Sequence, residues 1–179
     1  MAPTRKQFDT FVKSLGLKHF SADELLVNVG QHTNRPNNPV PDRSLWPNIV
    51  PTILLLNALR AELGKAVKIN SAYRGPAYNK AIGGRPASQH QDFRAIDFKC
   101  SGKLPATCAK LIRSWRGRPF YSPVTLDLVS EHAPLVEAGL KANKTAQGTA
   151  FVYSGGIGVY KTFVHVDCRG VNKDWSGAS

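Results

Sequence analysis

The stretches SQHQDFRAIDFKC at residues 88–100 and FVHVDCR at residues 163–169 carry the pattern that indicates the fold most clearly. Each contains an alternation of apolar and polar residues, which is typical of a β-strand with one buried face. In the second stretch this alternation places His165 and Asp167 on the same face. In the first, Asp97 stands between two apolar neighbours that point to the opposite face. Both stretches therefore predict strands that bury an apolar face and present polar side chains on the other.

The polar faces of these strands contain residue types that bind zinc. A zinc ion held by two histidines and one carboxylate, with a fourth position open, is a recurrent catalytic arrangement. His90 and Asp97 are seven positions apart, and a straight strand would separate them by roughly 23 Å, so a turn must bring them together. The residues alone leave two alternatives open: histidines that pack without a metal, and a buried Asp97 that pairs with Arg74 or Arg94.

The rest of the chain predicts helices around these strands. Helices are predicted over residues 4–15, 21–27, 47–63, 76–82, 105–115 and 133–142, and strands over residues 67–71, 95–100, 149–154, 158–160 and 163–168. Residues 28–48 predict a long ordered loop, and residues 141–150 a loose one. This order of elements favours a single α+β domain over residues 1–170, with helices packed around a small, mostly antiparallel sheet, followed by a C-terminal tail at residues 171–179.

The composition is that of a globular protein. Of 179 residues, 42% are hydrophobic, and no run of about 18 apolar residues is present, so we expect no membrane insertion. Basic residues near the N-terminus precede no apolar segment, so we expect no secretory signal. The three cysteines are widely spaced, which predicts buried, reduced thiols rather than a disulfide framework or a zinc ribbon.

The charge predicts a polyanionic partner. The chain has 24 Lys and Arg against 12 Asp and Glu, a net charge of +12, and such an excess steers association with acidic surfaces. No basic helix, RNA-binding signature or zinc-finger spacing accompanies the charge, so nucleic acid is not expected. The carboxylates of a bacterial cell wall are the other polyanionic candidate.

Three motifs together resemble one enzyme family. They are SAYRGPAYN at residues 71–79 with IGG at residues 82–84, the pattern Ser-x-His-x-x-x-x-Ala-x-Asp at residues 88–97, and the late strand at residues 163–167. This combination resembles the M15 zinc peptidases, the D-alanyl-D-alanine carboxypeptidase and peptidoglycan endopeptidase family, in particular the members of its subfamily A. The resemblance runs from about residue 20 to residue 169.

The resemblance implies a site as well as a fold. It implies a single Zn²⁺ ion held by His90, Asp97 and His165. Arg74 matches the family arginine that grips the substrate and the developing oxyanion, so it is both a catalytic and a substrate-binding candidate. Ser88 matches a serine that donates a hydrogen bond near the substrate.

The general base does not follow from the resemblance. Several branches of the family have an acidic residue three positions before the last histidine, and here that residue is Thr162. Asp167, on the same strand face as that histidine, is the best substitute as the catalytic carboxylate. Its alternative role is structural: an ion pair with Arg169, or a partner that orients the histidine. Glu131 and Glu137 are further candidates for the base.

The resemblance implies a zinc-dependent peptidase that hydrolyses peptide stems or cross-links of bacterial peptidoglycan. With no signal peptide and no wall-binding module, we expect a monomeric phage lysis or virion-associated enzyme, which accumulates in the cytoplasm and acts on the wall after lysis or from a phage particle. The alternative is a non-catalytic M15-like binding or virion-structural module. Thr162 motivates it, and so does Phe93, which replaces the family's usual glycine and predicts a different turn between the ligands.

Overall fold

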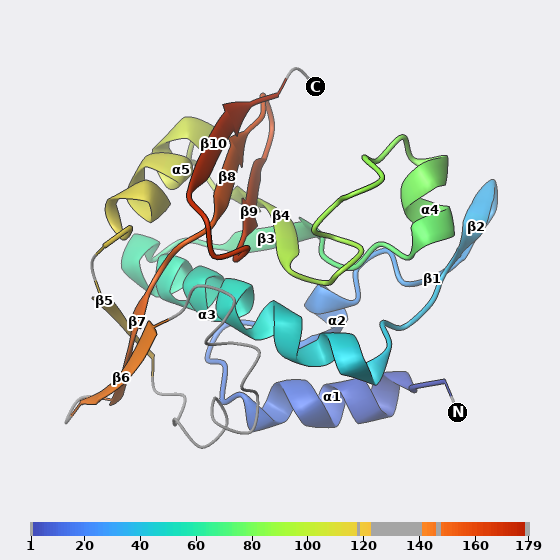
Figure 1. The fold of residues 1–179 in the computed structure, drawn as a ribbon, viewed down its shortest axis with the longest axis horizontal. Coiled ribbons are helices and arrows are strands. Elements are labelled where there is room, and N and C mark those ends of the chain that lie inside the picture. Colours follow the sequence, from blue (N-terminus) through green and yellow to red (C-terminus); the bar gives the residue numbers. More distant parts are fainter. Residues whose placement is uncertain (1, 118, 123–140, 146–147, 178–179) are drawn as a thin grey trace.

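The computed structural model describes residues 2–117, 119–122, 141–145 and 148–177. Figure 1 shows helix α3 (Trp46–Leu63) through the middle of the molecule, with α1 (Arg5–Ser14) on one side and the largest sheet on the other. This arrangement of helices around a small sheet confirms the predicted α+β fold. None of the helices in the described ranges has the length and apolar character that a bilayer crossing requires.

The helices begin and end close to the predicted positions. Besides α1 and α3 they are α2 (Ala22–Leu25), α4 (Pro76–Ala81) and α5 (Pro105–Ser114), with a 3-10 turn η1 at Arg43–Leu45. Thr4 and Ser21 each form a capping box, in which the hydroxyl accepts from a backbone N–H of the first turn. Gly64 ends α3 with a φ of 57°, which is the left-handed conformation that glycine adopts without strain.

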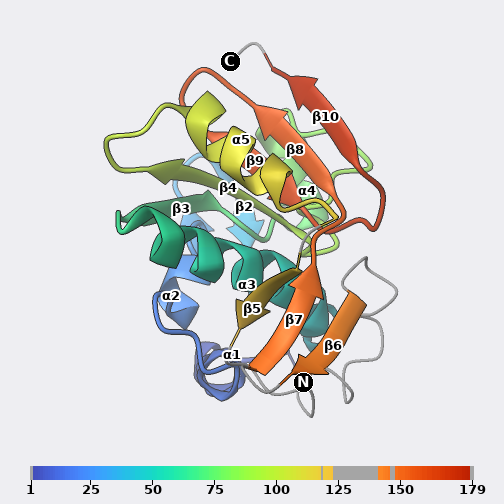
Figure 2. The ribbon, with the colours of Figure 1, turned by 90° about the vertical axis from the view of Figure 1, so that its left-hand side faces the viewer.

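The largest sheet in the described part of the chain has five strands in the order β10-β8-β9-β4-β3. They are β3 (Val67–Ser71), β4 (Ala95–Cys100), β8 (Gly156–Val159), β9 (Val164–Asp167) and β10 (Lys173–Ser176). All neighbours are antiparallel except β10 and β8, so the sheet is mostly antiparallel, as predicted. Figure 2 shows α5 lying along this sheet.

Two smaller sheets correct the loop predictions. The predicted loop at residues 28–48 contains an antiparallel pair, β1 (Gly30–His32) and β2 (Arg35–Asn38). The loose loop predicted at residues 141–150 is wrong, because β6 (Lys141–Thr145) and β7 (Gly148–Val152) pair there. β5 (Pro119–Ser122) completes that sheet in the order β5-β7-β6. The strand predicted over residues 149–154 overlaps β7. Its partners β5 and β6, like β1 and β2, are short segments without a regular alternation of apolar and polar residues, which is why these pairings were not predicted.

The end of the helix predicted over residues 133–142 is wrong. Residues 133–140 lie outside the described residues, and its last two residues belong to β6.

The last part of the chain is also structured where a tail was expected. β10 lies within residues 171–179 and pairs in parallel with β8. Asp174 of this strand forms ion pairs with Arg113 and Arg116, at 3.2 and 2.8 Å. Three of the four residues of β10 are exposed, so the strand forms through edge pairing and these ion pairs and has no alternation that would reveal it.

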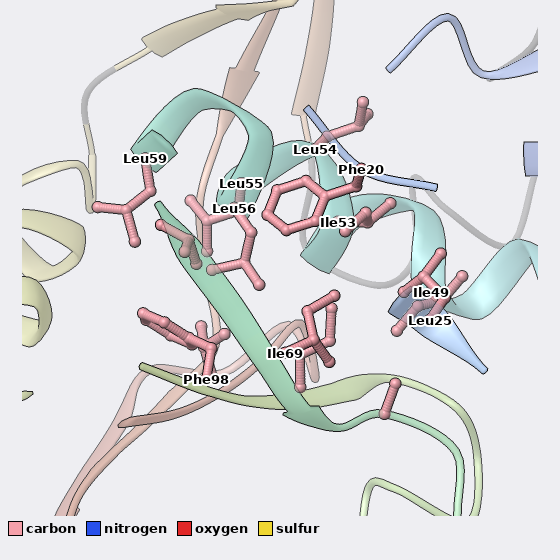
Figure 3. Packing of buried hydrophobic residues seen from close by; sticks show 14 of the residues in the cluster. Phe20, Leu25, Ile49, Ile53, Leu54, Leu55, Leu56, Leu59, Ile69 and Phe98 are labelled. Atoms are coloured by element: carbon pink, nitrogen blue, oxygen red, sulfur yellow. The ribbon is translucent and has the colours of Figure 1, made fainter. Parts of the chain in front are cut away.

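The hydrophobic core is built around α3. This helix is buried on several sides because it lies between α1 and the sheet; its fully or nearly fully buried residues include Ile49, Ile53, Leu54, Leu55, Leu56 and Leu59. Figure 3 shows Phe20, Ile69 of β3 and Phe98 of β4 around the same helix. The apolar faces of β4 and β9 belong to this core together with buried residues of α5. The cysteines are buried and unpaired, as predicted.

Candidate metal centre and active site

The polar faces of β4 and β9 meet in register. Asp97 lies directly opposite His165, and Ala95 lies opposite Asp167. Residues opposite each other in an antiparallel pair point to the same face of the sheet. The predicted alternation is therefore also the observed one, and it brings a carboxylate and an imidazole together from two strands that are far apart in the sequence.

A tight turn returns His90 to the same place. The backbone N–H of Phe93 donates to the carbonyl of His90, and that of Arg94 donates to the carbonyl of Gln89. The carbonyl of His90 also accepts from the backbone N–H of Arg74, which ties the turn to the end of β3. The chain thus folds back between His90 and the start of β4, as the metal-site interpretation requires.

Phe93 does not change the turn in the way that was expected. Its φ is 54°, the left-handed conformation that a glycine would supply. The left-handed conformation costs about 1–2 kcal/mol for a residue with a side chain. Burial of a phenylalanine side chain stabilises the folded state by about 1.5–3 kcal/mol. The ring is fully buried, against Phe8 and Tyr73 at centroid distances of 5.9 and 5.7 Å. Core packing therefore offsets the backbone strain, and the prediction of a different turn is wrong.

Three ligand atoms converge at this point. Asp97 Oδ1 lies 3.1 Å from His90 Nε2 and 2.8 Å from His165 Nδ1. All three atoms lie within 4.8 Å of one another, and all three residues are buried. Ligands at about 2.0–2.2 Å around a tetrahedral zinc ion would be separated by about 3.3–3.6 Å, which lies between the shortest and longest of these separations, so rearrangement of the side chains would accommodate the ion.

The outer nitrogen of each imidazole is also occupied. His90 Nδ1 donates to the carbonyl oxygen of Ala72 at 2.7 Å. His165 Nε2 donates to Asp167 Oδ2 at 3.1 Å. Metal-binding histidines almost always donate their second ring N–H to a carbonyl or carboxylate in this way. The donor set and the outer partners both fit a zinc ion.

The electrostatics of the cluster keep the carboxylate ionised. Burial alone would raise the pKa of Asp97, but His90 and His165 hold that pKa well below its ordinary value. Burial lowers the pKa of His90 despite the opposing effect of Asp97. Burial also acts to lower the pKa of His165, but its hydrogen bonds to Asp167 and Asp97 outweigh this effect and raise it. A carboxylate with a lowered pKa between two imidazoles suits a cation.

Arg74 adds a positive charge beside this cluster. Its Nη2 pairs with Asp97 Oδ2, and its Nε donates to Ser71 Oγ at 2.8 Å. The ion-pair alternative for Asp97 is therefore realised, but through the oxygen that does not face the histidines. Arg74 and Asp97 also line a cavity of about 220 Å³, together with Asn28, Asn70, Ser71, Tyr78, Ile82 and Phe163.

Ser88 lies in the turn rather than in this cavity. Its Oγ accepts from the backbone N–H of His90 at 3.4 Å, and its carbonyl accepts from the backbone N–H of Gln91 at 2.9 Å. These contacts shape the turn that carries the first histidine. Ser88 is not among the residues that line the cavity.

Asp167 is buried and held on several sides. It has no exposed surface, and Arg169 donates to both of its oxygens, from Nε at 2.8 Å and from Nη2 at 2.6 Å. The backbone N–H of Gly156 donates to Oδ1 at 3.2 Å. Burial would raise its pKa, but Arg169 and His165 hold that pKa far below its ordinary value. The structure therefore combines both structural roles that the sequence left open, the ion pair and the orientation of His165. Glu131 and Glu137 lie outside the described residues.

Comparison with known families agrees with this geometry. The sequence profile described as Peptidase M15 matches residues 18–125. The chain belongs to the peptidase M15 family. This membership supports a zinc peptidase, and the matched region contains Arg74, Ser88, His90 and Asp97. The M15 match ends before His165, so the second half of the site rests on the structure. No curated protein and no solved structure matches the chain at a significant level.

The sequence did not reveal two contacts of this centre. One is the carbonyl of Ala72, and the other is the aromatic ring of Trp175, which lies 5.2 Å from that of His165. A backbone carbonyl has no sequence signature, and the strand that carries Trp175 has no periodicity. The sequence signal for the second contact was the pair of glycines at positions 156 and 158, whose lack of side chains leaves room for the ring of Trp175.

Proposed function

We propose that this protein is a zinc-dependent peptidase that hydrolyses the peptide stems or cross-links of bacterial peptidoglycan. One observation carries the proposal: His90 Nε2, His165 Nδ1 and Asp97 Oδ1 converge, and the other nitrogen of each histidine has a hydrogen-bond acceptor. The chemistry that a bound zinc ion supplies is Lewis-acid polarisation of the scissile carbonyl and activation of water.

Arg74 is the residue that we assign to both catalysis and substrate binding. Among the described residues, none accepts a hydrogen bond from its Nη1, so that group remains for a ligand in the cavity. A guanidinium at this place would bind a substrate carboxylate or stabilise the negative charge that develops on the attacked carbonyl oxygen. Its anchorage by Asp97 and Ser71 restricts its orientation, which lowers the entropic cost of binding.

Asp167 and Ser88 receive supporting roles in this proposal. Asp167 accepts from His165 and is saturated by Arg169, so we assign it to the orientation of His165 rather than to proton transfer. Ser88 holds the turn that carries His90. The general base stays unassigned among the residues that the structure describes.

Two features support peptidoglycan as the substrate. The net charge of +12 favours association with the anionic wall. The cavity of about 220 Å³ is smaller than the pockets of about 300–1,000 Å³ that hold drug-sized ligands. It would therefore accept a short peptide with small side chains, and its cation would meet a stem carboxylate.

The decisive test is mass spectrometry of the peptides released from purified peptidoglycan. We expect release that stops with a chelator and returns with zinc, and fragment masses that identify the bond. The matched controls are His165→Ala, which should be inactive, and His19→Ala, whose histidine lies outside the centre. No release from protein with stoichiometric zinc would contradict the proposal and favour the non-catalytic binding module that Thr162 suggested.

A further inference from the structure

Strand β10 brings an aromatic side chain to the candidate metal centre. Trp175 pairs with Gly158 of β8, and Gly158 pairs with His165 of β9. His165 in turn lies opposite Asp97 of β4. These four residues form one row across four neighbouring strands, so their side-chain positions share one face of the sheet. The row runs from the edge of the sheet directly into the ligand cluster.

The glycine in this row leaves space for the tryptophan ring. A Cβ atom on Gly158 would lie 2.6 Å from both Cε2 and Nε1 of Trp175. A Cβ atom on Gly156 would lie 2.5 Å from Asp167 Oδ2 and 3.0 Å from Trp175 Cζ3. Neither glycine has a positive φ, so the absence of a side chain, and not backbone freedom, is what the structure uses at both positions.

Across this gap Trp175 contacts both a metal ligand and its supporting network. Its ring centroid lies 5.2 Å from that of His165, and the guanidinium carbon of Arg169 lies 5.6 Å from it. Its Nε1 donates to the hydroxyl of Tyr160 at 3.2 Å, which fixes the orientation of the indole. Arg169 holds Asp167, and Asp167 accepts from His165. The indole therefore lies against His165 and Arg169, the two residues that Asp167 connects.

We propose that Trp175 is a positioning residue of the metal centre, which holds the imidazole of His165 and the Arg169–Asp167 pair through the gap at Gly158. The inference rests on the proposed function, because it concerns the same zinc site. Its physical basis is water exclusion and restricted rotation: the apolar indole strengthens the charged hydrogen bonds beneath it and limits the side-chain conformations of His165. The C-terminal strand thereby becomes part of the site.

The test is the zinc affinity of the 179-residue chain, measured by competition with a chromophoric chelator. Loss of an outer partner typically costs about 10–100-fold in metal affinity. We expect a loss in this range for Trp175→Ala and for Gly158→Ala, whose methyl group would displace the indole. Trp175→Phe should retain affinity within about threefold of the wild type. Lys173→Ala, an exposed residue two positions away on β10, should have no effect.

Two further measurements separate positioning from general stability. In the Trp175→Ala background, Gly158→Ala should cause no additional loss, because the ring that it would displace is already absent. The visible spectrum of the cobalt-substituted protein should change in Trp175→Ala and stay unchanged in Lys173→Ala. Circular dichroism confirms that each variant is folded, and Gly158→Ala together with Trp175→Phe provides the test if Trp175→Ala does not fold.

The outcomes distinguish this inference from the proposed function. If the wild type takes up no zinc, the proposed function fails, and this inference fails with it. If the wild type binds zinc and folded Trp175→Ala binds it within about threefold of the wild-type affinity, only the inference is overturned. Losses that add in the double variant would also overturn it, since the two residues would then act independently.

Discussion

The two histidines of the candidate metal centre are held in different ways. His90 lies in a turn, and its outer nitrogen donates to the backbone carbonyl of Ala72. His165 lies in the middle of the sheet, and its outer nitrogen donates to the side chain of Asp167. Asp167 depends in turn on Arg169. His90 is thus oriented by a backbone carbonyl, and His165 by the side chain of Asp167, which Arg169 holds in turn.

The two histidines should therefore respond differently to mutation of their surroundings. A backbone carbonyl persists when its side chain is replaced, so the orientation of His90 should tolerate substitution of the residue that supplies the carbonyl. The orientation of His165 should be sensitive at each step of its network. Substitutions of the two ligands, of Asp167 and Arg169, and of Ala72 test this difference between the two histidines.

Removal of either histidine should abolish the site. We expect His90→Ala and His165→Ala each to lower zinc affinity by more than about 100-fold, beyond the range for loss of an outer partner. Equilibrium dialysis with metal analysis would measure this, with His19→Ala as the matched control. Full zinc occupancy in either ligand variant would contradict the assignment of that ligand.

Substitution of Asp167 should weaken the site without abolishing it. Asp167→Asn keeps the shape but removes the charge that supports His165, so we expect zinc affinity to fall by about 10–100-fold. At saturating zinc the turnover should then recover substantially. If Asp167 were instead the general base, zinc affinity would stay unchanged and turnover would fall by at least about 100-fold. Measuring affinity and turnover separately decides between these roles.

Substitution of Arg169 should act mainly on stability and in a pH-dependent way. Arg169→Gln removes charged hydrogen bonds to a buried carboxylate, which should lower the free energy of unfolding by about 1–3 kcal/mol at pH 7. Arg169 contributes to the lowered pKa of Asp167, so this stabilisation is fully present above about pH 4, the unfolded pKa of an aspartate. It is lost progressively as the pH falls from there through the lowered pKa of the folded state.

Denaturant unfolding of the metal-free protein between about pH 7 and pH 3 would measure this effect. The difference between wild type and Arg169→Gln should narrow as the pH falls below about 4. A constant difference over the whole range would show that the ion pair to Asp167 is not its source.

Substitution of Ala72 should have the smallest effect. Ala72→Gly leaves the carbonyl that orients His90 in place, so zinc affinity should stay within about twofold of the wild type. Added backbone freedom should cost about 0.5–1 kcal/mol in stability. Chelator competition and thermal unfolding would check both values. A loss of affinity as large as that of Asp167→Asn would remove the contrast between the two histidines.

Local chemistry explains what the sequence could predict. Alternation in residues 95–100 and 163–168 identified both strands and the faces that carry Asp97 and His165, because the side-chain period of a strand is fixed. The separation of His90 from Asp97 required a turn, and the turn is present. Helical spacing of apolar residues placed the helices close to their observed bounds, and in the structure Thr4 and Ser21 cap two of them.

Long-range contacts explain what the sequence could not predict. The left-handed conformation of Phe93 depends on packing against Phe8, which is far away in the sequence. The place of Trp175 beside His165 depends on the parallel register of an edge strand with no hydrophobic period. Neither contact has a local signature, and both lie close to the candidate site.

The most direct test of the metal centre is anomalous diffraction at the zinc edge from crystals of the zinc-loaded protein. We predict a single peak in the cluster, within about 2.0–2.2 Å of His90 Nε2, His165 Nδ1 and Asp97 Oδ1. The absence of a peak there in a protein that contains zinc would contradict the assignment of these three ligands. So would a zinc ion bound to His165 Nε2, because that nitrogen could not then donate to Asp167.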